Sequence, residues 1–159
     1  MIYDTFGSPL GQMHLCSDGT YLTALTFTGQ KYEDRHIPKD SIFGICSVLE
    51  ETKYWLSLYF NGEIPNFLPP LNPQGTPFQK KVWEQLMEIP YGKTVTYGEL
   101  GQQLGCKSAQ AVGGAVGRNP ISILIPCHRV VGAGGKLTDY AGGVEKKAAL
   151  LKLEKDHLC

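Results

Sequence analysis

The sequence predicts a small α/β domain at the amino end of the chain, followed by a helical domain that contains a helix-turn-helix. Three observations predict this fold class. Residues 2–28 are rich in β-forming side chains that alternate in polarity, which is typical of strands. In residues 41–60, and through much of the second half, apolar side chains recur at helical spacing. Residues 63–75 contain four prolines and interrupt both patterns, so we divide the chain into residues 1–74 and 75–159.

The amino-terminal domain is expected to contain a mainly antiparallel sheet with one helix packed against it. The segment Ser17-Asp18-Gly19-Thr20 is a turn signal that divides residues 2–28 into two or three strands. Residues 29–40 are polar and are expected to form a loop. The helical spacing that follows, ended by Asn61-Gly62, predicts a helix from Ser41 to Phe60.

The helices of the second half begin at recognisable caps. Thr76-Pro77 puts a capping residue before a proline at the first helical position. Thr96 and Glu99 form a capping box, and Ser108 caps a further segment. The helices predicted in this way cover about residues 77–88, 97–104, 108–117 and 144–156. The middle two are joined by a short turn that contains glycine, which is the pattern of a helix-turn-helix.

Composition limits the class of protein. A hydrophobic fraction of 42% is that of a folded globule, and no apolar run is long enough to span a membrane. The first residues lack a basic segment followed by an apolar one, so no signal peptide is expected. The five cysteines form no close pairs, which indicates a reducing, cytoplasmic location rather than a disulfide framework. No cysteine or histidine spacing predicts a metal site.

The net charge of zero hides an asymmetry between the two halves. Residues 1–74 contain 4 Lys and Arg against 8 Asp and Glu, whereas residues 75–159 contain 11 against 7. A basic half is what a phosphate backbone requires, although surface charge also drifts in this way by chance.

The segment Pro126-Cys127-His128-Arg129 carries the strongest chemical signal. Its cysteine follows a proline that restricts the backbone and precedes two side chains that can be positively charged. Such neighbours lower the pKa of a thiol and make it a nucleophile. The segment also follows an apolar run, residues 121–125, in which a cysteine can be an inert core residue, so from the residues alone both interpretations remain open.

The third predicted helix, residues 108–117, is unusually rich in alanine and glycine. Reading bases in the major groove requires long polar side chains, and Gln110 is the only one before Arg118. Small residues instead allow the backbone to approach a partner closely, which suits the minor groove of DNA. The alternative is a tightly packed core helix.

Several motifs occur together in this half of the chain. They are Ile89-Pro90-Tyr91-Gly92-Lys93, Thr96-Tyr97-Gly98-Glu99-Leu100, Ala111-Val112-Gly113-Gly114, Asn119-Pro120, Pro126-Cys127-His128-Arg129-Val130 and Tyr140-Ala141-Gly142-Gly143. In this order and spacing they resemble the O6-alkylguanine-DNA alkyltransferases, which are DNA repair proteins. The resemblance is strong from about Gly75 to Glu154 and weaker before, where it rests mainly on Gly7-Ser8-Pro9-Leu10-Gly11. It implies a ribonuclease H-like amino-terminal domain and an all-α, winged helix-turn-helix-like DNA-binding domain.

The resemblance also implies a direct reversal of damage. Cys127 would attack the alkyl carbon of O6-alkylguanine and keep the alkyl group, so that each molecule acts once. His128 would take the thiol proton through a water, and Glu154 would orient His128. The hydroxyl of Tyr97 would bind the flipped guanine, and Asn119 would tie the helix-turn-helix to the cysteine loop. No cofactor is implied, because the lesion supplies the alkyl group.

The implied partner is double-stranded DNA that contains O6-alkylguanine, with O4-alkylthymine as a further candidate substrate, and the protein is expected to be a monomer. In the family an arginine fills the gap left by the flipped base, and the matching residue here is Gln110. The residues expected to contact DNA are Tyr97, Gln110, Ala111, Gly114, Arg118 and Arg129, and for Arg129 a structural role is the alternative. Those expected to form the substrate pocket are Ser122, Val130, Tyr140, Ala141 and Gly142.

Two other functions are compatible with parts of this pattern. A cysteine hydrolase would use Cys127 and His128 for many turnovers and would need an oxyanion hole. A helix-turn-helix module without chemistry would leave Cys127 buried, although its helix poor in base-reading side chains does not suit a sequence-specific regulator.

Overall fold

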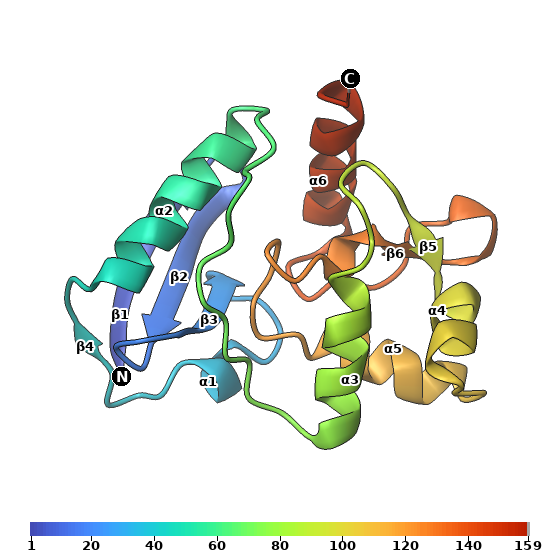
Figure 1. The fold of residues 1–159 in the computed structure, drawn as a ribbon, viewed down its shortest axis with the longest axis horizontal. Helices are drawn as coiled ribbons and strands as arrows, with labels where there is room; N and C mark the ends of the chain where they lie inside the picture. Colours follow the sequence, from blue (N-terminus) through green and yellow to red (C-terminus); the bar gives the residue numbers. More distant parts are fainter. Residues whose placement is uncertain (159) are drawn as a thin grey trace.

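A computed structural model describes residues 1–158, and Cys159 lies outside the described residues. Its helices are α1 (Glu33–His36), α2 (Ser47–Phe60), α3 (Pro77–Leu86), α4 (Tyr97–Leu104), α5 (Ala109–Gly117) and α6 (Val144–Asp156), with short 3-10 helices η1 (Cys127–Arg129) and η2 (Ala133–Gly135). Its strands are β1 (Ile2–Ser8), β2 (Gly11–Ser17), β3 (Leu22–Phe27), β4 (Ile42–Phe43), β5 (Val95–Thr96) and β6 (Val130–Val131). The sheet and α2 lie beside the carboxy-terminal helices, as Figure 1 shows. One buried apolar cluster includes residues of both parts, among them Tyr59, Trp83 and Leu150.

The amino-terminal sheet has the strand order β3-β2-β1-β4. β1, β2 and β3 are antiparallel neighbours, as the alternating pattern predicts. All six residues of β3 are buried, so this strand lies inside the molecule. α2 covers one face of the sheet (Figure 1) and buries Trp55, Leu56 and Tyr59. The helix therefore turns its apolar stripe toward the core.

Two predictions for this domain need correction. Residues 29–40 are not only loop, because they contain the short helix α1. The helix predicted from Ser41 begins at Ser47, because Ile42 and Phe43 instead pair in parallel with Ile2 and Tyr3 as β4. The edge of β1 that β2 leaves free forms hydrogen bonds with this segment. This long-range pairing outweighs the local preference for helix that the spacing of apolar residues predicted from Ser41 onward.

β3 is an edge strand of the sheet, but it is buried, and its free edge forms hydrogen bonds with two distant segments of the chain. The Leu22 N–H donates to Pro70 O at 2.8 Å, which attaches the proline-rich connector. The Leu25 N–H donates to Pro120 O and its carbonyl accepts from Ser122 N–H, both at 2.9 Å. β3 therefore fixes the start of the segment that leads to Cys127.

The caps predicted in the second half are formed. The hydroxyl oxygens of Thr76, Thr96 and Ser108 accept from the backbone N–H three residues ahead, each at 3.1 Å. α4, α5 and α6 begin and end within a residue of the predicted positions, whereas α3 ends at Leu86, two residues early. Within residues 1–158, no helix is both long and apolar enough to cross a bilayer.

The carboxy-terminal part is mainly helical, but the expectation that it is all α is wrong. Val95 and Thr96 pair in parallel with Val130 and Val131, forming the two-stranded sheet β5-β6. Extended backbone is favourable here, because the pairing satisfies the buried N–H and C=O groups that follow η1. The pairing also places the start of α4 next to the end of the cysteine loop.

Candidate active site and nucleic-acid groove

Cys127 is the first residue of η1 and is 6% exposed. Its N–H donates to Ile125 O at 2.8 Å, and its carbonyl accepts from the Val130 N–H. Burial raises the pKa of the thiol, while the Asn119 side chain and the Lys147 cation act in the opposite direction. The thiol is thus held in a tight turn and needs a neighbouring base to lose its proton.

Asn119 organises the loop before the cysteine. Its amide Nδ2 donates to Ile121 O at 3.2 Å and to Ile125 O at 2.8 Å, and its Oδ1 accepts from the Ile121 N–H at 3.0 Å. Ile123, between them, has φ 71°, which is strained for a β-branched residue. The three bonds of the buried Asn119 therefore hold a loop that the backbone would not adopt alone.

Glu154 is the centre of a buried polar cluster. Its carboxylate accepts from His128 Nε2 at 2.6 Å, from Tyr59 OH at 2.7 Å and from the Gly92 N–H at 3.1 Å. Arg129 donates to the same carboxylate through Nε at 2.9 Å and through a terminal nitrogen at 3.1 Å. Burial alone would raise the pKa of Glu154, but its bonds to His128 and Arg129 outweigh burial and lower the pKa to about 2.

The same cluster determines the tautomer of His128. A carboxylate only accepts hydrogen bonds, so Nε2 of His128 carries a proton and donates it toward Glu154. Nδ1, which is buried without a hydrogen-bond partner among residues 1–158, is then free to accept a proton. Burial lowers the pKa of His128 and keeps the ring neutral, although Glu154 opposes this. His128 can therefore act as a base through Nδ1.

Arg129 does not lie at a DNA-contacting surface, where the sequence pattern predicted it. It is only 9% exposed, and its donors are used by Glu154 and by Ile89 O, at 2.8 Å. A buried carboxylate needs a compensating charge, and Arg129 supplies it. Arg129 is therefore a structural residue of the buried cluster and not a DNA contact.

Lys147 was missed by sequence reasoning. It lies on α6, is fully buried, and its Nζ has no hydrogen-bond partner in the described part of the chain. Nζ is 5.8 Å from the centre of the Tyr97 ring, and burial lowers the pKa of the ammonium group. The feature of the sequence that could have indicated its burial is its helical spacing from Leu150 and Glu154. These three residues lie on one face of α6 and are all buried.

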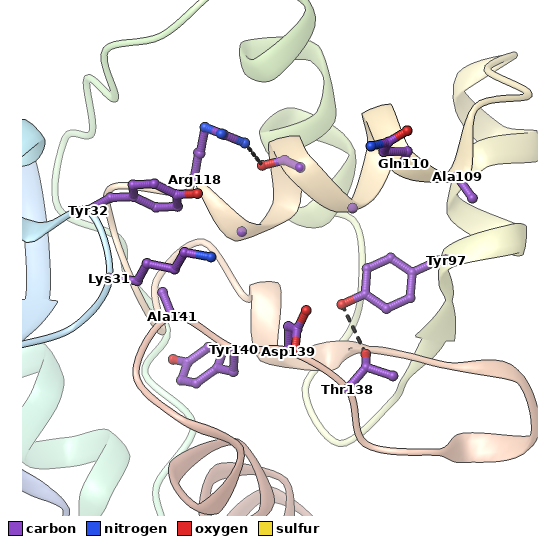
Figure 2. Close-up of a pocket in the computed structure, with 13 residues that line it drawn as sticks. Lys31, Tyr32, Tyr97, Ala109, Gln110, Arg118, Thr138, Asp139, Tyr140 and Ala141 are labelled. Carbon is purple, nitrogen blue, oxygen red and sulfur yellow. Dashed lines mark hydrogen bonds between the residues drawn. The ribbon is translucent and has the colours of Figure 1, made fainter.

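A groove of about 690 Å³ lies between α5 and residues 138–141 (Figure 2). Tyr97 stands at one end, where its hydroxyl accepts from Thr138 Oγ1 at 3.3 Å. Burial raises the pKa of Tyr97. The other end is formed by Lys31 and Tyr32 of the amino-terminal part. Along the groove α5 presents small residues, which are Ala109, Gly113, Gly114 and Gly117.

The residues expected to contact DNA gather mostly at this groove. Gln110, Gly114 and Arg118 line it together with Tyr97, and Ala111 is exposed on the same helix. Arg118 donates to Gly114 O at 3.2 Å, and this contact directs its guanidinium along the groove wall.

Only two of the five residues expected to form the substrate pocket line the groove. Tyr140 and Ala141 line the groove, and burial raises the pKa of the Tyr140 hydroxyl well above its usual value. Ser122 and Val130 are buried and do not line the groove. Gly142 is closely packed, since a Cβ there would lie 2.9 Å from the Phe27 ring and 3.0 Å from the Tyr140 ring. Within residues 1–158, no group of three or more His, Cys, Asp or Glu side chains is placed to hold a metal ion.

Comparison with known proteins decides the family. Residues 1–73 match the ribonuclease-like domain, and residues 77–156 the DNA-binding domain, of 6-O-methylguanine DNA methyltransferase. This chain belongs to that family. The methylated-DNA–protein-cysteine methyltransferase of Mycobacterium bovis is 46% identical over 154 residues, covering 96% of this chain and 92% of that protein. The methyltransferase of the same name from Methanosarcina acetivorans is 45% identical over 159 residues, covering 97% and 98%.

Solved structures of alkyltransferases agree with this assignment. Mycobacterium tuberculosis OGT in complex with DNA superimposes with a TM-score of 0.90 at 42% identity, covering 99% of this chain and 94% of that one. The O6-methylguanine-DNA methyltransferase of Pyrococcus kodakaraensis gives 0.71 at 28% identity, covering 96% and 98%. The two-part arrangement of a sheet domain and a helical DNA-binding domain is therefore that of the methyltransferase family.

Proposed function

We propose that this methyltransferase repairs DNA by direct reversal, moving the alkyl group of O6-alkylguanine in duplex DNA to Sγ of Cys127. The observation that carries the proposal is the buried chain of groups beside the acceptor motif, in which Glu154 fixes the tautomer of His128 next to Cys127. Membership of the family supports the reaction class, and the DNA complex of the mycobacterial relative supports the partner.

The chemistry is a single displacement. The sulfur forms a bond to the alkyl carbon while the bond from that carbon to O6 breaks, and its electron pair stays with guanine. The thiol proton passes to His128 Nδ1, directly or through one water. Guanine takes one proton from water as it leaves, and His128 returns its proton to water, so the protons balance. The products are unmodified guanine and a thioether on Cys127. No group in the cluster hydrolyses a thioether, so each molecule acts once and needs no cofactor.

The reacting base must reach a thiol that is almost fully buried. We propose that guanine is flipped out of the duplex through the minor groove, with the small residues of α5 against the DNA. Gln110 would enter the gap in the stack, and Tyr97 would hydrogen-bond the flipped base. Tyr140 and Ala141, with Ser122, Val130 and Gly142 behind them, would form the pocket. O4-alkylthymine is proposed as a second substrate on the same route.

We propose a ribonuclease H-like fold for residues 1–74, and a winged helix-turn-helix for residues 75–159, in which α4 and α5 are the two helices. A monomeric, cytoplasmic protein is proposed as well, and the cysteines, which form no close pairs in the sequence, are consistent with a reducing location.

The test is intact and peptide mass spectrometry after incubation with a duplex that carries one O6-methylguanine. The expected result is one methyl group per protein, on the peptide that contains Cys127. Cys127→Ser should gain none while still binding duplex DNA, because the phosphate contacts lie on other residues. A cysteine hydrolase would leave the mass of the protein unchanged, and a DNA-binding module would leave both protein and lesion unchanged.

A further inference from the structure

The groove beside α5 is completed by the amino-terminal domain. Lys31 and Tyr32, which follow β3, form the end of the groove opposite Tyr97 (Figure 2). The Lys31 N–H donates to Ala141 O at 3.2 Å, so this turn is fastened to the wall of the groove. We infer that the amino-terminal domain takes part in DNA binding, and that Lys31 and Arg35, together with Arg118 of the carboxy-terminal part, form a phosphate-binding site.

The three cations surround one aromatic ring. The Lys31 Nζ lies 5.2 Å, the Arg35 Cζ 5.3 Å and the Arg118 Cζ 4.9 Å from the centre of the Tyr32 ring. Tyr32 has φ 68°, which is uncommon for an aromatic residue, and this backbone places its ring between the two domains. The negative face of the ring partly offsets the mutual repulsion of the cations.

These charges are not neutralised by the protein. Among residues 1–158, none of the three cations forms an ion pair with a carboxylate. The nearby carboxylate of Glu33 is engaged elsewhere, by His14 Nδ1 and Thr26 Oγ1, each at 3.0 Å. Cations that the fold brings together and leaves without a carboxylate partner suit an anion from outside.

The position of the cluster is exceptional for its domain. Residues 1–74 are acidic and contain only four Lys and Arg. Lys53 is occupied by Asp4 at 2.7 Å and Glu50 at 2.9 Å, whereas Lys31 lines the groove and Arg35 lies beside the Tyr32 ring at its end. Two of the four basic residues of an acidic domain thus lie at the Tyr32 ring, beside the helix-turn-helix residue Arg118.

The occupant that fits is the backbone of duplex DNA. The cluster is continuous with the groove along α5, and a duplex laid along this helix carries a phosphate past its carboxyl end, where Arg118 stands. Arg118 and Lys31 then contact the backbone without reading sequence. This inference rests on the proposed function, because it takes the α5 groove as the DNA site.

The experiment measures binding of an unmodified duplex by fluorescence anisotropy over a series of salt concentrations. Lys31→Glu and Arg35→Ala should weaken binding on the order of threefold to tenfold at low salt, and each should reduce the slope of log Kd against log salt by about one for each phosphate that the variant no longer binds. Lys31→Arg should restore wild-type binding. Lys39→Ala, an exposed lysine away from the Tyr32 ring, is the matched control.

Transfer from free O6-methylguanine base provides the second readout. Lys39→Ala should leave it unchanged, because the free base meets no backbone phosphate, and thermal unfolding of Lys31→Glu and Arg35→Ala should show that both variants are folded. The inference would be overturned if Lys31→Glu and Arg35→Ala bound the duplex with the affinity and salt slope of the wild type. It would also be overturned if Lys39→Ala lost as much affinity for the duplex as these two variants. If wild-type protein takes no methyl group from either substrate, the proposed function itself fails, and that outcome is distinct.

Discussion

His128 Nε2 and Glu154 Oε2 lie 2.6 Å apart inside the protein, although 26 residues of sequence separate them. The same carboxylate accepts from Tyr59 on α2 and from the Gly92 N–H before β5. The carboxylate of Glu154, which orients His128, is therefore held by the amino-terminal domain as well as by α6. Changes at Glu154 should affect stability and chemistry together.

Replacing Glu154 with Gln should lower the free energy of unfolding by about 3–5 kcal/mol, because it leaves the buried guanidinium of Arg129 without its partner. It should also slow methyl transfer, since a neutral amide does not hold His128 in one tautomer. Urea unfolding and the single-turnover rate are the measurements. Glu145→Gln, at an exposed position of α6, is the control and should change neither. Wild-type stability in Glu154→Gln would mean that this cluster does not support the fold.

Stability should fall as the solution becomes acidic. The pKa of Glu154 is lowered to about 2 in the folded protein from an ordinary 4.5, so its contribution is full above pH 4.5 and is lost as pH falls toward 2. The pKa of buried His128 is also lowered, so its contribution begins to disappear below its ordinary 6.5. In both cases the unfolded chain binds more protons. Urea unfolding across pH should show this slope, and Glu154→Gln should flatten the part below pH 4.5.

Lys147→Met should slow alkylation of Cys127 at neutral pH several-fold, because the Lys147 cation opposes the rise in thiol pKa that burial causes. The difference should shrink at higher pH, where the thiol ionises without help. The rate of reaction with iodoacetamide across pH measures this. Lys152→Met, on the exposed side of α6, should match wild type. An identical pH profile for Lys147→Met would remove Lys147 from any role in ionising the thiol.

Gln110→Ala should slow repair of duplex DNA more than transfer from the free base, which requires no flipping. Gln110→Arg should keep or raise the duplex rate, with steeper salt dependence if the new charge meets a phosphate. Single-turnover rates on both substrates give the comparison, with Gln103→Ala on α4 as the control. Equal effects of Gln110→Ala on the two substrates would return Gln110 to the status of an ordinary exposed helix residue.

Asp139→Asn should tighten binding of duplex DNA by roughly twofold to fivefold at low salt, because Asp139 is the one carboxylate among the described residues that line the groove and it repels phosphate. The gain should disappear at high salt. Anisotropy with an unmodified duplex measures it, and Asp40→Asn, exposed in the amino-terminal domain, is the control. Weaker binding by Asp139→Asn would indicate that the carboxylate contacts DNA as an acceptor instead.

The sequence by itself determined the features that depend on near neighbours. The caps at Thr76, Thr96 and Ser108 need only a hydroxyl and an N–H three residues ahead, so the starts of three helices follow from local spacing. The motif around Cys127 and its resemblance to alkyltransferases are likewise visible in order and spacing alone. The candidate nucleophile and its neighbouring base therefore follow from the sequence.

Only the tertiary structure decided the features that depend on distant partners. Ile42 joins a strand because Met1 and Ile2 lie beside it, and Val95 because Val130 does. Lys147 is buried because it lies on the face of α6 that packs inward, and Arg129 is buried because it supplies the counter-charge of Glu154. The hydrogen bond from the Lys31 N–H to Ala141 O likewise joins two residues that are distant in sequence and belong to different domains. In each case the partner that surrounds the side chain lies far away in the sequence, and composition and periodicity do not identify that partner.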